Sequence, residues 1–172
     1  MTDPRANGIM RPDLGIVASM IPRGSRVLDL GCGDGALLAH LISERDCRGQ
    51  GVEVSPEAFH RCLARGIALV SADIDEGLSD FADDSFDAVV LSQTLPSLHR
   101  PLQALREMMR VAPLSVVSFP NFGHWRLRAD LLFHGRMPTS RTLPYPWHDS
   151  PNIRFCTCLL YTSDAADESS SV

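Results

Sequence analysis

Two aspartates and three glycines stand together near the start of the sequence, in the stretch DLGCGDG from Asp29 to Gly35. Glycines at every second position let the backbone turn tightly and let a ligand approach where a Cβ would clash. Carboxylates beside such a turn favour a ligand that carries positive charge. These residues therefore predict a site where a glycine turn binds a small cationic molecule.

The same turn also fits a dinucleotide-binding fingerprint, because Gly31, Gly33 and Ala36 match G-x-G-x-x-A. However, the turn is flanked by Asp29 and Asp34, and a carboxylate would repel a pyrophosphate by about 4 kcal/mol for unit charges 4 Å apart at an effective dielectric of 20. S-adenosylmethionine has no phosphate and carries an ammonium and a sulfonium, which suit Asp29. We therefore expect this cofactor, and the alternative is a glycine turn with solvated aspartates. The expected contacts in this stretch are Asp29, Gly31, Cys32, Gly33 and Gly35.

A strand and a helix must position this turn. The apolar residues Val27, Leu28 and Leu30 form a short run that is typical of a buried parallel strand. Apolar residues then recur at helical spacing from Ala36 to Ile42. Strand, glycine turn and helix make up the first crossover of a nucleotide-binding α/β fold. A further helix is predicted before it, from Pro12 with Leu14, Val17 and Met20 or Ile21 on its apolar face.

A third carboxylate stands about 20 positions after the glycines. Glu53 closes a predicted second strand, 51–54. An acidic residue at this spacing accepts hydrogen bonds from the ribose hydroxyls of a bound nucleoside. We predict this role for Glu53, with Val54 also in contact with the cofactor. The alternative is a carboxylate at the end of a strand that faces water.

Polar residues also follow the third and fourth predicted strands, 67–71 and 86–92. Because the carboxyl ends of parallel strands meet at one edge of the sheet, these residues are candidates for the same site. We expect Asp73 to accept from an adenine amino group, Ile74 to offer an apolar face or backbone N–H, and Gln93 to contact the cofactor. For Asp73 and Ile74 the alternative is an ordinary acidic loop.

Three later elements complete the predicted fold. A helix begins at Pro101, with Leu102, Leu105 and Met109 predicted to face the interior. A fifth strand is predicted at 114–119, followed by a helix at 125–134. The stretch 137–151 is too rich in proline for a helix and predicts an ordered loop or lid that is anchored by the aromatic residues Tyr145 and Trp147.

Methyl transfer from a sulfonium requires mainly that donor and acceptor be aligned. A neutral acceptor also needs a route for its proton, which histidine commonly supplies. The candidates are His99, His124 and His148. We favour His124 as the catalytic residue because it follows the fifth strand at the functional edge. The alternative for each is a histidine of the surface or of a loop.

The composition restricts the class of protein. The 172 residues are 44% hydrophobic and 22% charged, which suits one folded domain. A net charge of −5 without a long basic run argues against a nucleic-acid partner. No apolar segment approaches the ~20 residues that span a bilayer, and the N-terminus lacks an apolar signal core, so we expect no membrane association and a cytoplasmic location. Five cysteines without metal-binding spacing predict reduced thiols and no metal site.

Several longer motifs carry a resemblance to known families. With VLDLGCGDG, GVEV, SADIDEGL and FDAVVLSQTL in register, the chain resembles class I S-adenosylmethionine-dependent methyltransferases. With MRPDL, SQTL, SFPNFGHWR, GRMP and LPYPWHDSPNIRFCT it resembles more specifically the methionine biosynthesis protein MetW family. The resemblance implies an α/β fold, a Rossmann-like three-layer sandwich around a mostly parallel, seven-stranded sheet. It also implies a role in methionine biosynthesis beside the homoserine O-acyltransferase, and it names no methyl acceptor.

The two ends of the chain differ from this family. We expect a flexible leader at 1–10, a single domain at 11–157, and a tail at 158–172 that is not part of the evolved domain. The tail, CLLYTSDAADESSSV after Thr157, resembles a translated sequencing adapter and ends in an acidic, serine-rich run. If so, the sheet lacks its last strands, and the fifth strand becomes an exposed edge that favours aggregation.

Two classes of function remain open. In the first, the chain binds S-adenosylmethionine and acts on the homoserine O-acyltransferase by docking. In the second, it is a small-molecule methyltransferase. Both need the cofactor, so the glycine turn does not separate them. A nicotinamide-dependent dehydrogenase is disfavoured by Asp29.

Overall fold

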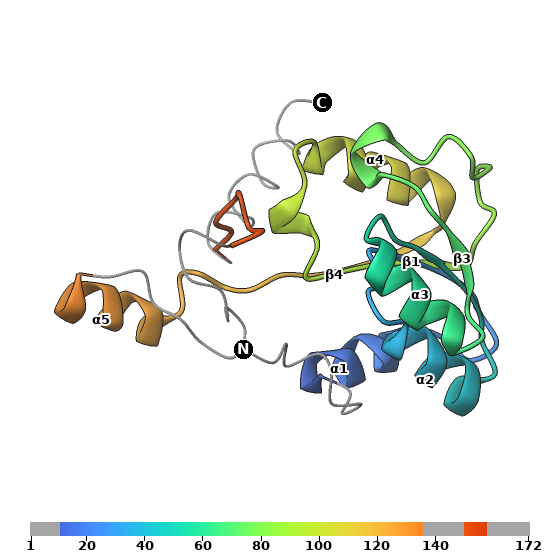
Figure 1. Cartoon of the computed structure of the whole chain (residues 1–172), viewed down its shortest axis with the longest axis horizontal. Helices are drawn as coiled ribbons and strands as arrows, with labels where there is room; N and C mark the ends of the chain where they lie inside the picture. The colour runs from blue at the N-terminus through green and yellow to red at the C-terminus, as the bar shows by residue number, and fades with distance from the viewer. Residues whose placement is uncertain (1–10, 136–149, 158–172) are drawn as a thin grey trace. The chain divides into compact units, whose positions relative to one another are not determined.

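A computed structural model describes residues 11–135 and 150–157 (Figure 1). The chain falls into two compact units. The first comprises the described residues up to Leu95 together with Arg100–Ser118, and the second comprises Pro96–His99 together with the described residues from Phe119 onward. The predicted leader and tail lie outside the described residues, so both stay predictions.

A five-stranded sheet forms the centre of the first unit. Its order is β3-β2-β1-β4-β5, and every neighbouring pair is parallel. The strands are β1 (Arg26–Leu30), β2 (Arg48–Val52), β3 (Ala68–Val70), β4 (Ala88–Ser92) and β5 (Leu114–Ser118). The order reverses between β1 and β4, and such a switch point is where doubly wound sheets bind ligands. Within the described part of the chain, β5 stands at the edge of the sheet.

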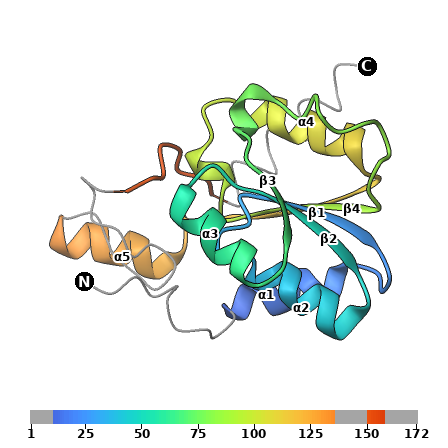
Figure 2. The same ribbon diagram turned by 45° about the vertical axis from the view of Figure 1, so that its right-hand side comes forward.

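Helices cover both faces of this sheet. The helices of the first unit are α1 (Pro12–Met20), α2 (Ala36–Arg45), α3 (Pro56–Ala64) and α4 (Pro101–Val111). Figures 1 and 2 show α1 and α2 on one side and α4 on the other. Cys62 of α3 belongs to the same buried cluster as the apolar residues of α1 and α2, which places α3 on their side. The predicted Rossmann-like, three-layer α/β fold is therefore confirmed.

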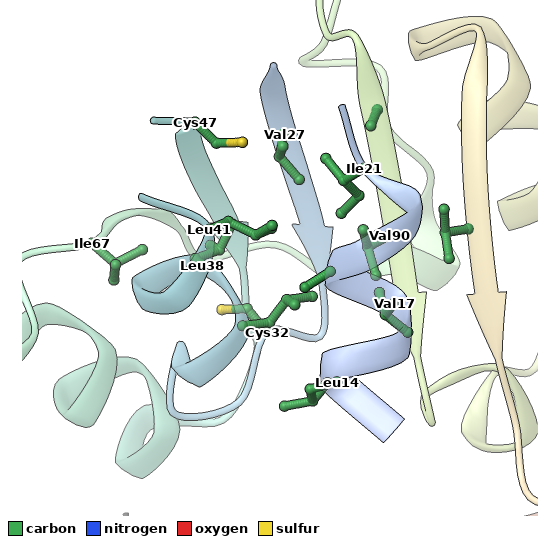
Figure 3. Close-up of a cluster of buried hydrophobic side chains, with 14 of the residues drawn as sticks. Leu14, Val17, Ile21, Val27, Cys32, Leu38, Leu41, Cys47, Ile67 and Val90 are labelled. Atoms are coloured by element: carbon green, nitrogen blue, oxygen red, sulfur yellow. The ribbon is translucent and has the colours of Figure 1, made fainter. Parts of the chain in front are cut away.

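The core of this side lies between the helices and one face of the sheet (Figure 3). Val17 and Ile21 come from the α1 region and pack near Val27 of β1 and Leu41 of α2. Burying such a side chain stabilises the fold by about 1.5–3 kcal/mol. Of the two residues predicted to end the apolar face of α1, Ile21 is buried and Met20 is exposed.

Strand β2 starts earlier than predicted and ends before Glu53. The strand contains two glycines in place of typical strand residues, so its composition does not indicate a strand. Each glycine leaves room for a core side chain. A Cβ at Gly49 would stand 2.6 Å from Leu38, and one at Gly51 would stand 2.5 Å from the sulfur of Cys32. The prediction of 51–54 was wrong because glycine is a poor strand former even where packing requires it.

The predicted inner face of α4 was also wrong. Leu102 and Met109 are exposed, and Leu105 is half-buried. The buried residues of this helix are Ala104, Met108 and Val111. Both sets of residues repeat at helical spacing, so periodicity allows either face. Arg110 selects between them, because its guanidinium donates to the carbonyl oxygens of Leu78 and Phe81 at 2.9 Å.

The second unit contains Pro96 and Ser97 of the short 3₁₀ helix η3 (Leu95–Ser97), the helix α5 (Trp125–His134) and the segment 150–157. The N–H of Phe122 donates to the carbonyl of Cys156 at 3.1 Å, and the rings of Phe122 and Phe155 meet edge to face. Arg154 donates to the carbonyl of His99 at 2.7 Å. The aromatic residues of the predicted loop, Tyr145 and Trp147, lie outside the described residues.

No helix in the described ranges combines the length and apolar character needed to cross a membrane.

Candidate functional site

The loop of residues 31–35, here called the glycine loop, joins β1 to α2. The N–H groups of Gly31 and Cys32 both donate to the carbonyl of Val52, at 2.8 and 3.1 Å. Gly31 has a φ of +69°, and a Cβ there would stand 2.6 Å from Oγ1 of Thr94. At Gly33, by contrast, a Cβ would meet nothing within 4 Å. The loop is thus closed on the side of β4 and open at Gly33, where a ligand can approach the backbone.

Glu53 is tied directly to this loop. Its carboxylate accepts from the N–H groups of Gly33 at 2.8 Å, Val54 at 3.0 Å and Ser55 at 2.9 Å. Bonds of this kind to a charged acceptor are shorter and stronger than neutral ones. They hold the chain that follows β2 against the glycine loop at Gly33. The side chain of Val54 is 65% exposed.

Asp29 is the charged group buried beneath the loop. Only 3% of its surface is exposed. Burial raises the pKa of Asp29 from 3.8 to about 7, the charge of Arg11 opposes this rise, and the charge of Glu53 adds to it. A buried carboxylate of this kind is stabilised by a cation, since opposite charge favours the ionised form.

Asp34 contributes less to the charge of the loop than its position suggests. Its carboxylate pairs with Arg65 at 2.8 Å and also accepts from the N–H of Ala36. The charge of Asp34 is therefore partly neutralised within the protein. The electrostatic argument against a pyrophosphate consequently rests mainly on Asp29.

Cys32 faces the core and not the open side of the loop. Its Sγ lies 3.8 Å from that of Cys62. Burial, followed by the charge of Asp29, raises the pKa of the Cys32 thiol far above its usual value. The protonated, buried thiol is a poor nucleophile. Only the backbone of Cys32 is available for the predicted cofactor contact.

The residues predicted at the ends of β3 and β4 are Asp73, Ile74 and Gln93, and each has a different environment. Asp73 caps a short 3₁₀ helix by accepting from the N–H of Asp75 at 2.9 Å. The side chain of Ile74 is buried in the interior, which leaves no exposed apolar face for a ring. Gln93 has a positive φ of 63° and donates through its side chain to Asp13 at 3.4 Å. The predicted cofactor contacts of these three residues stay predictions.

His124 belongs to the second unit, so it is not among the residues that the first unit brings together. It is the N-cap of α5, and its Nδ1 accepts from the N–H of Arg126 at 3.3 Å. Its ring stacks on that of Trp125. This arrangement gives His124 a structural role, and its catalytic role stays a prediction. His148 lies outside the described residues.

The sequence argument missed Arg11, and it noted Thr94 only for its place at the carboxyl end of the fourth predicted strand. Thr94 closes the loop at Gly31. Arg11 donates from Nη2 to Oγ of Ser92 at 2.8 Å. Figure 3 shows the N-terminal end of α1, at Leu14, on the side toward which the strands point. The position of Arg11 just before Pro12 could have indicated its role. Because the link from α1 to β1 is short, the N-terminal end of α1 lies at the carboxyl edge of the sheet.

Within residues 11–135 and 150–157, no group of three or more histidine, cysteine, aspartate or glutamate side chains could hold a metal ion.

A family model described as methionine biosynthesis protein MetW matches residues 11–170. The match enters the segment 158–172, whose foreign origin stays a prediction. The chain is also 39% identical over 150 residues to the bifunctional methionine biosynthesis protein MetXA/MetW of Rhodopirellula baltica. That alignment covers 82% of this chain and 24% of the relative.

Methyltransferases form a second group of similar proteins. Ajmaline N-methyltransferase of Rauvolfia serpentina is 32% identical over 94 residues, which cover 50% of this chain and 32% of the relative. An S-adenosylmethionine-dependent methyltransferase from Mesorhizobium loti has a similar structure, with a TM-score of 0.54 and 27% identity, over 64% of this chain and 52% of the other. A methyltransferase from Thermotoga maritima shares the fold at a TM-score of 0.64 and 20% identity, over 88% of this chain and 66% of the other. The chain thus spans a third or less of the length of these two curated relatives.

Proposed function

We propose, from the premise that this chain belongs to the methionine biosynthesis protein MetW family, that it binds S-adenosylmethionine at the glycine loop and acts beside the homoserine O-acyltransferase. The observation that carries the proposal is the bond between the carboxylate of Glu53 and the N–H of Gly33 at 2.8 Å. It joins an acceptor for a ribose diol to the open position of the loop. We also propose a cytoplasmic location, where the free thiols stay reduced.

The remaining capacity of Glu53 fits a diol. A carboxylate offers about four lone-pair sites. Three are used by the N–H groups of Gly33, Val54 and Ser55. One ribose hydroxyl can therefore be accepted without breaking any bond, and the second by exchange with one N–H.

Asp29 fits the charge of the same ligand. A bound ammonium or sulfonium lowers the pKa of a buried carboxyl by stabilising its charged form. Because the pKa of Asp29 stands at about 7 without a ligand, ligand binding near neutral pH should release a proton. The 27% identity to an S-adenosylmethionine-dependent methyltransferase supports the choice of cofactor.

A partner in methionine biosynthesis is supported by the name of the relative from Rhodopirellula baltica, which joins MetXA and MetW in one protein. We propose that this chain docks on the homoserine O-acyltransferase and that S-adenosylmethionine regulates the complex.

The test is to mix the protein with purified homoserine O-acyltransferase, with and without S-adenosylmethionine, and to measure co-elution and the acylation rate. A stable complex or a changed rate that depends on the cofactor supports the proposal. The Glu53→Ala variant serves as a control, because its response should need a much higher cofactor concentration. No complex and an unchanged rate would contradict the docking role.

A second candidate is a small-molecule methyltransferase, favoured by the 32% identity to an N-methyltransferase over half of the chain. In that case the loop holds the methyl donor, and His124 is the proposed route for the acceptor's proton. Formation of S-adenosylhomocysteine with a cell extract, without any change in acylation, would favour this candidate.

A further inference from the structure

Arg11 stands just before α1 and uses only part of its guanidinium within the protein. Nη2 donates to Ser92 Oγ at 2.8 Å, and that hydroxyl in turn contacts Ser118 Oγ at 3.0 Å. The same nitrogen lies 3.3 Å from Asp13 Oδ2. The Nε of Arg11 is buried and has no hydrogen-bond partner among the described residues. A guanidinium has five donors, and the partners of Arg11 among the described residues are reached from Nη2.

The charge of Arg11 reaches Asp29 without a direct ion pair. It opposes the effect of burial on the pKa of Asp29, which shows that the two charges interact. Among the described residues, however, the ion pair of Arg11 is with Asp13. Arg11 is bonded to Ser92, two positions beyond Val90, which is the β4 partner of Asp29. A cation bonded to β4 and a buried carboxylate on the neighbouring strand β1 complement an α-amino acid group, which carries a carboxylate and an ammonium.

Asp13 is the group that opposes a ligand carboxylate here. Its contact with Arg11, at 3.3 Å, is longer than the 2.7–2.9 Å of a strong charge-assisted bond. Both side chains are partly exposed, and such pairs contribute little stability. The side chain of Gln93 donates to the same carboxylate oxygen and partly satisfies it. A ligand carboxylate can therefore replace Asp13 on Arg11.

We propose that Arg11 binds the carboxylate of the amino-acid end of the S-adenosyl ligand, while Asp29 faces its ammonium. This inference rests on the proposed function and adds the residue that selects for the carboxylate. Arg11 could instead serve only to fasten α1 to β4 through Ser92. That structural role would not distinguish ligands with and without a carboxylate, so the ratio of their affinities separates the two roles.

The test uses calorimetric titration with S-adenosylhomocysteine and its decarboxylated analogue. Wild type should bind the carboxylate form at least tenfold more tightly, and Arg11→Met should reduce this ratio to below threefold. Arg11→Lys should keep an intermediate ratio, because it keeps the charge and loses the planar fork. Arg23→Met is the matched control: it also removes one positive charge, from an exposed pair with Asp46, and should keep the wild-type ratio.

The outcomes are distinguishable. If wild type binds both ligands equally, or if Arg11→Met keeps the full ratio, the role of Arg11 is contradicted while the proposed function stands. If wild type binds neither ligand, the proposed function itself fails. Thermal unfolding of each variant verifies folding, and Arg11→Lys gives a result should Arg11→Met not fold.

Discussion

The glycine loop and α5 differ in how much of their structure is fixed by contacts. Around the loop, the N–H of Gly33 is bonded to Glu53, and Asp29 is buried in the first unit. Helix α5 has no buried side chain, and Leu132 and Phe133 are each 79% exposed. The glycine loop is therefore held by a strand–turn–helix segment that has its own core. The helix α5 has no such core among the described residues.

The first way to break this comparison is Gly31→Ala, for which we expect the largest effect. The new Cβ would stand 2.6 Å from Oγ1 of Thr94, at a φ of +69°. Strain at positive φ costs about 1–2 kcal/mol, and overpacking adds about 1–3 kcal/mol. The free energy of unfolding should fall by about 2–5 kcal/mol, as measured by urea titration, with loss of cofactor binding.

Two further variants separate the cost of backbone strain from the cost of overpacking. Gly24→Ala has a similar φ of +76° and no atom within 4 Å of the new Cβ, so it should show the strain alone. Adding Thr94→Ala to Gly31→Ala should recover the part of the loss that overpacking causes. Equal losses for Gly24→Ala and Gly31→Ala would contradict a loop closed by Thr94.

Asp29→Asn tests how the buried carboxyl below the glycine loop changes stability with pH. The folded pKa of about 7 lies above the value of 3.8 for the unfolded carboxyl. Between these values the folded state holds more protons, so the contribution of Asp29 is fully present below pH 3.8 and is lost as pH rises through 7. The loss amounts to at most about 4 kcal/mol.

Urea unfolding without ligand should therefore show Asp29→Asn gaining stability relative to wild type between pH 4 and pH 8. Above pH 8 the difference should be constant. A difference that does not change with pH would mean that Asp29 titrates normally. Affinity of wild type for S-adenosylhomocysteine should rise with pH up to about 7, whereas that of the variant should not.

Glu53→Ala tests the link between ribose recognition and loop structure. The variant leaves three N–H groups without their charged acceptor, and one unsatisfied group costs about 1–3 kcal/mol if it stays dry. Calorimetry should show at least a tenfold weaker affinity for S-adenosylhomocysteine, with a modest loss of stability. Glu57→Ala, which removes an exposed carboxylate nearby, is the control. An unchanged dissociation constant for Glu53→Ala would mean that its carboxylate only holds the loop.

The smallest effect is expected in α5. His124→Ala removes the N-cap and should destabilise the helix by about 1 kcal/mol, whereas His124→Asn keeps a capping acceptor. Neither variant should change the affinity for S-adenosylhomocysteine. If methyl transfer is found, both should lose it, since asparagine cannot carry the proton. Retained transfer in His124→Asn would leave His124 as a cap only.

The sequence predicted the elements whose ends carry a local signal. The glycine loop follows a short strand rich in apolar residues, and α5 was predicted at its observed bounds of Trp125–His134. It predicted poorly where distant residues decide the outcome. Gly49 and Gly51 make room for Leu38 and Cys32, so β2 lacked its usual composition.

Distant residues also decide the inner face of α4 and part of the candidate site. Arg110 fixes the rotation of α4 through carbonyl groups about 30 positions away, which periodicity cannot express. Asp29 and Glu53 could be predicted to lie at the glycine loop because they have a fixed spacing from the glycines, and their contacts with a cofactor stay predictions. Arg11 was not predicted as a site residue because a single arginine before a helix is not a sequence motif. Its place becomes clear only in the fold, where it is bonded to Ser92.

The most direct test of the central claim is a calorimetric titration of the whole chain with S-adenosylhomocysteine and, separately, with NAD. The buried Asp29 and the acceptor Glu53 predict one site for S-adenosylhomocysteine and no measurable binding of NAD. Tighter binding of NAD than of S-adenosylhomocysteine, or no binding of S-adenosylhomocysteine at any pH between 6 and 9, would contradict this account of the glycine loop.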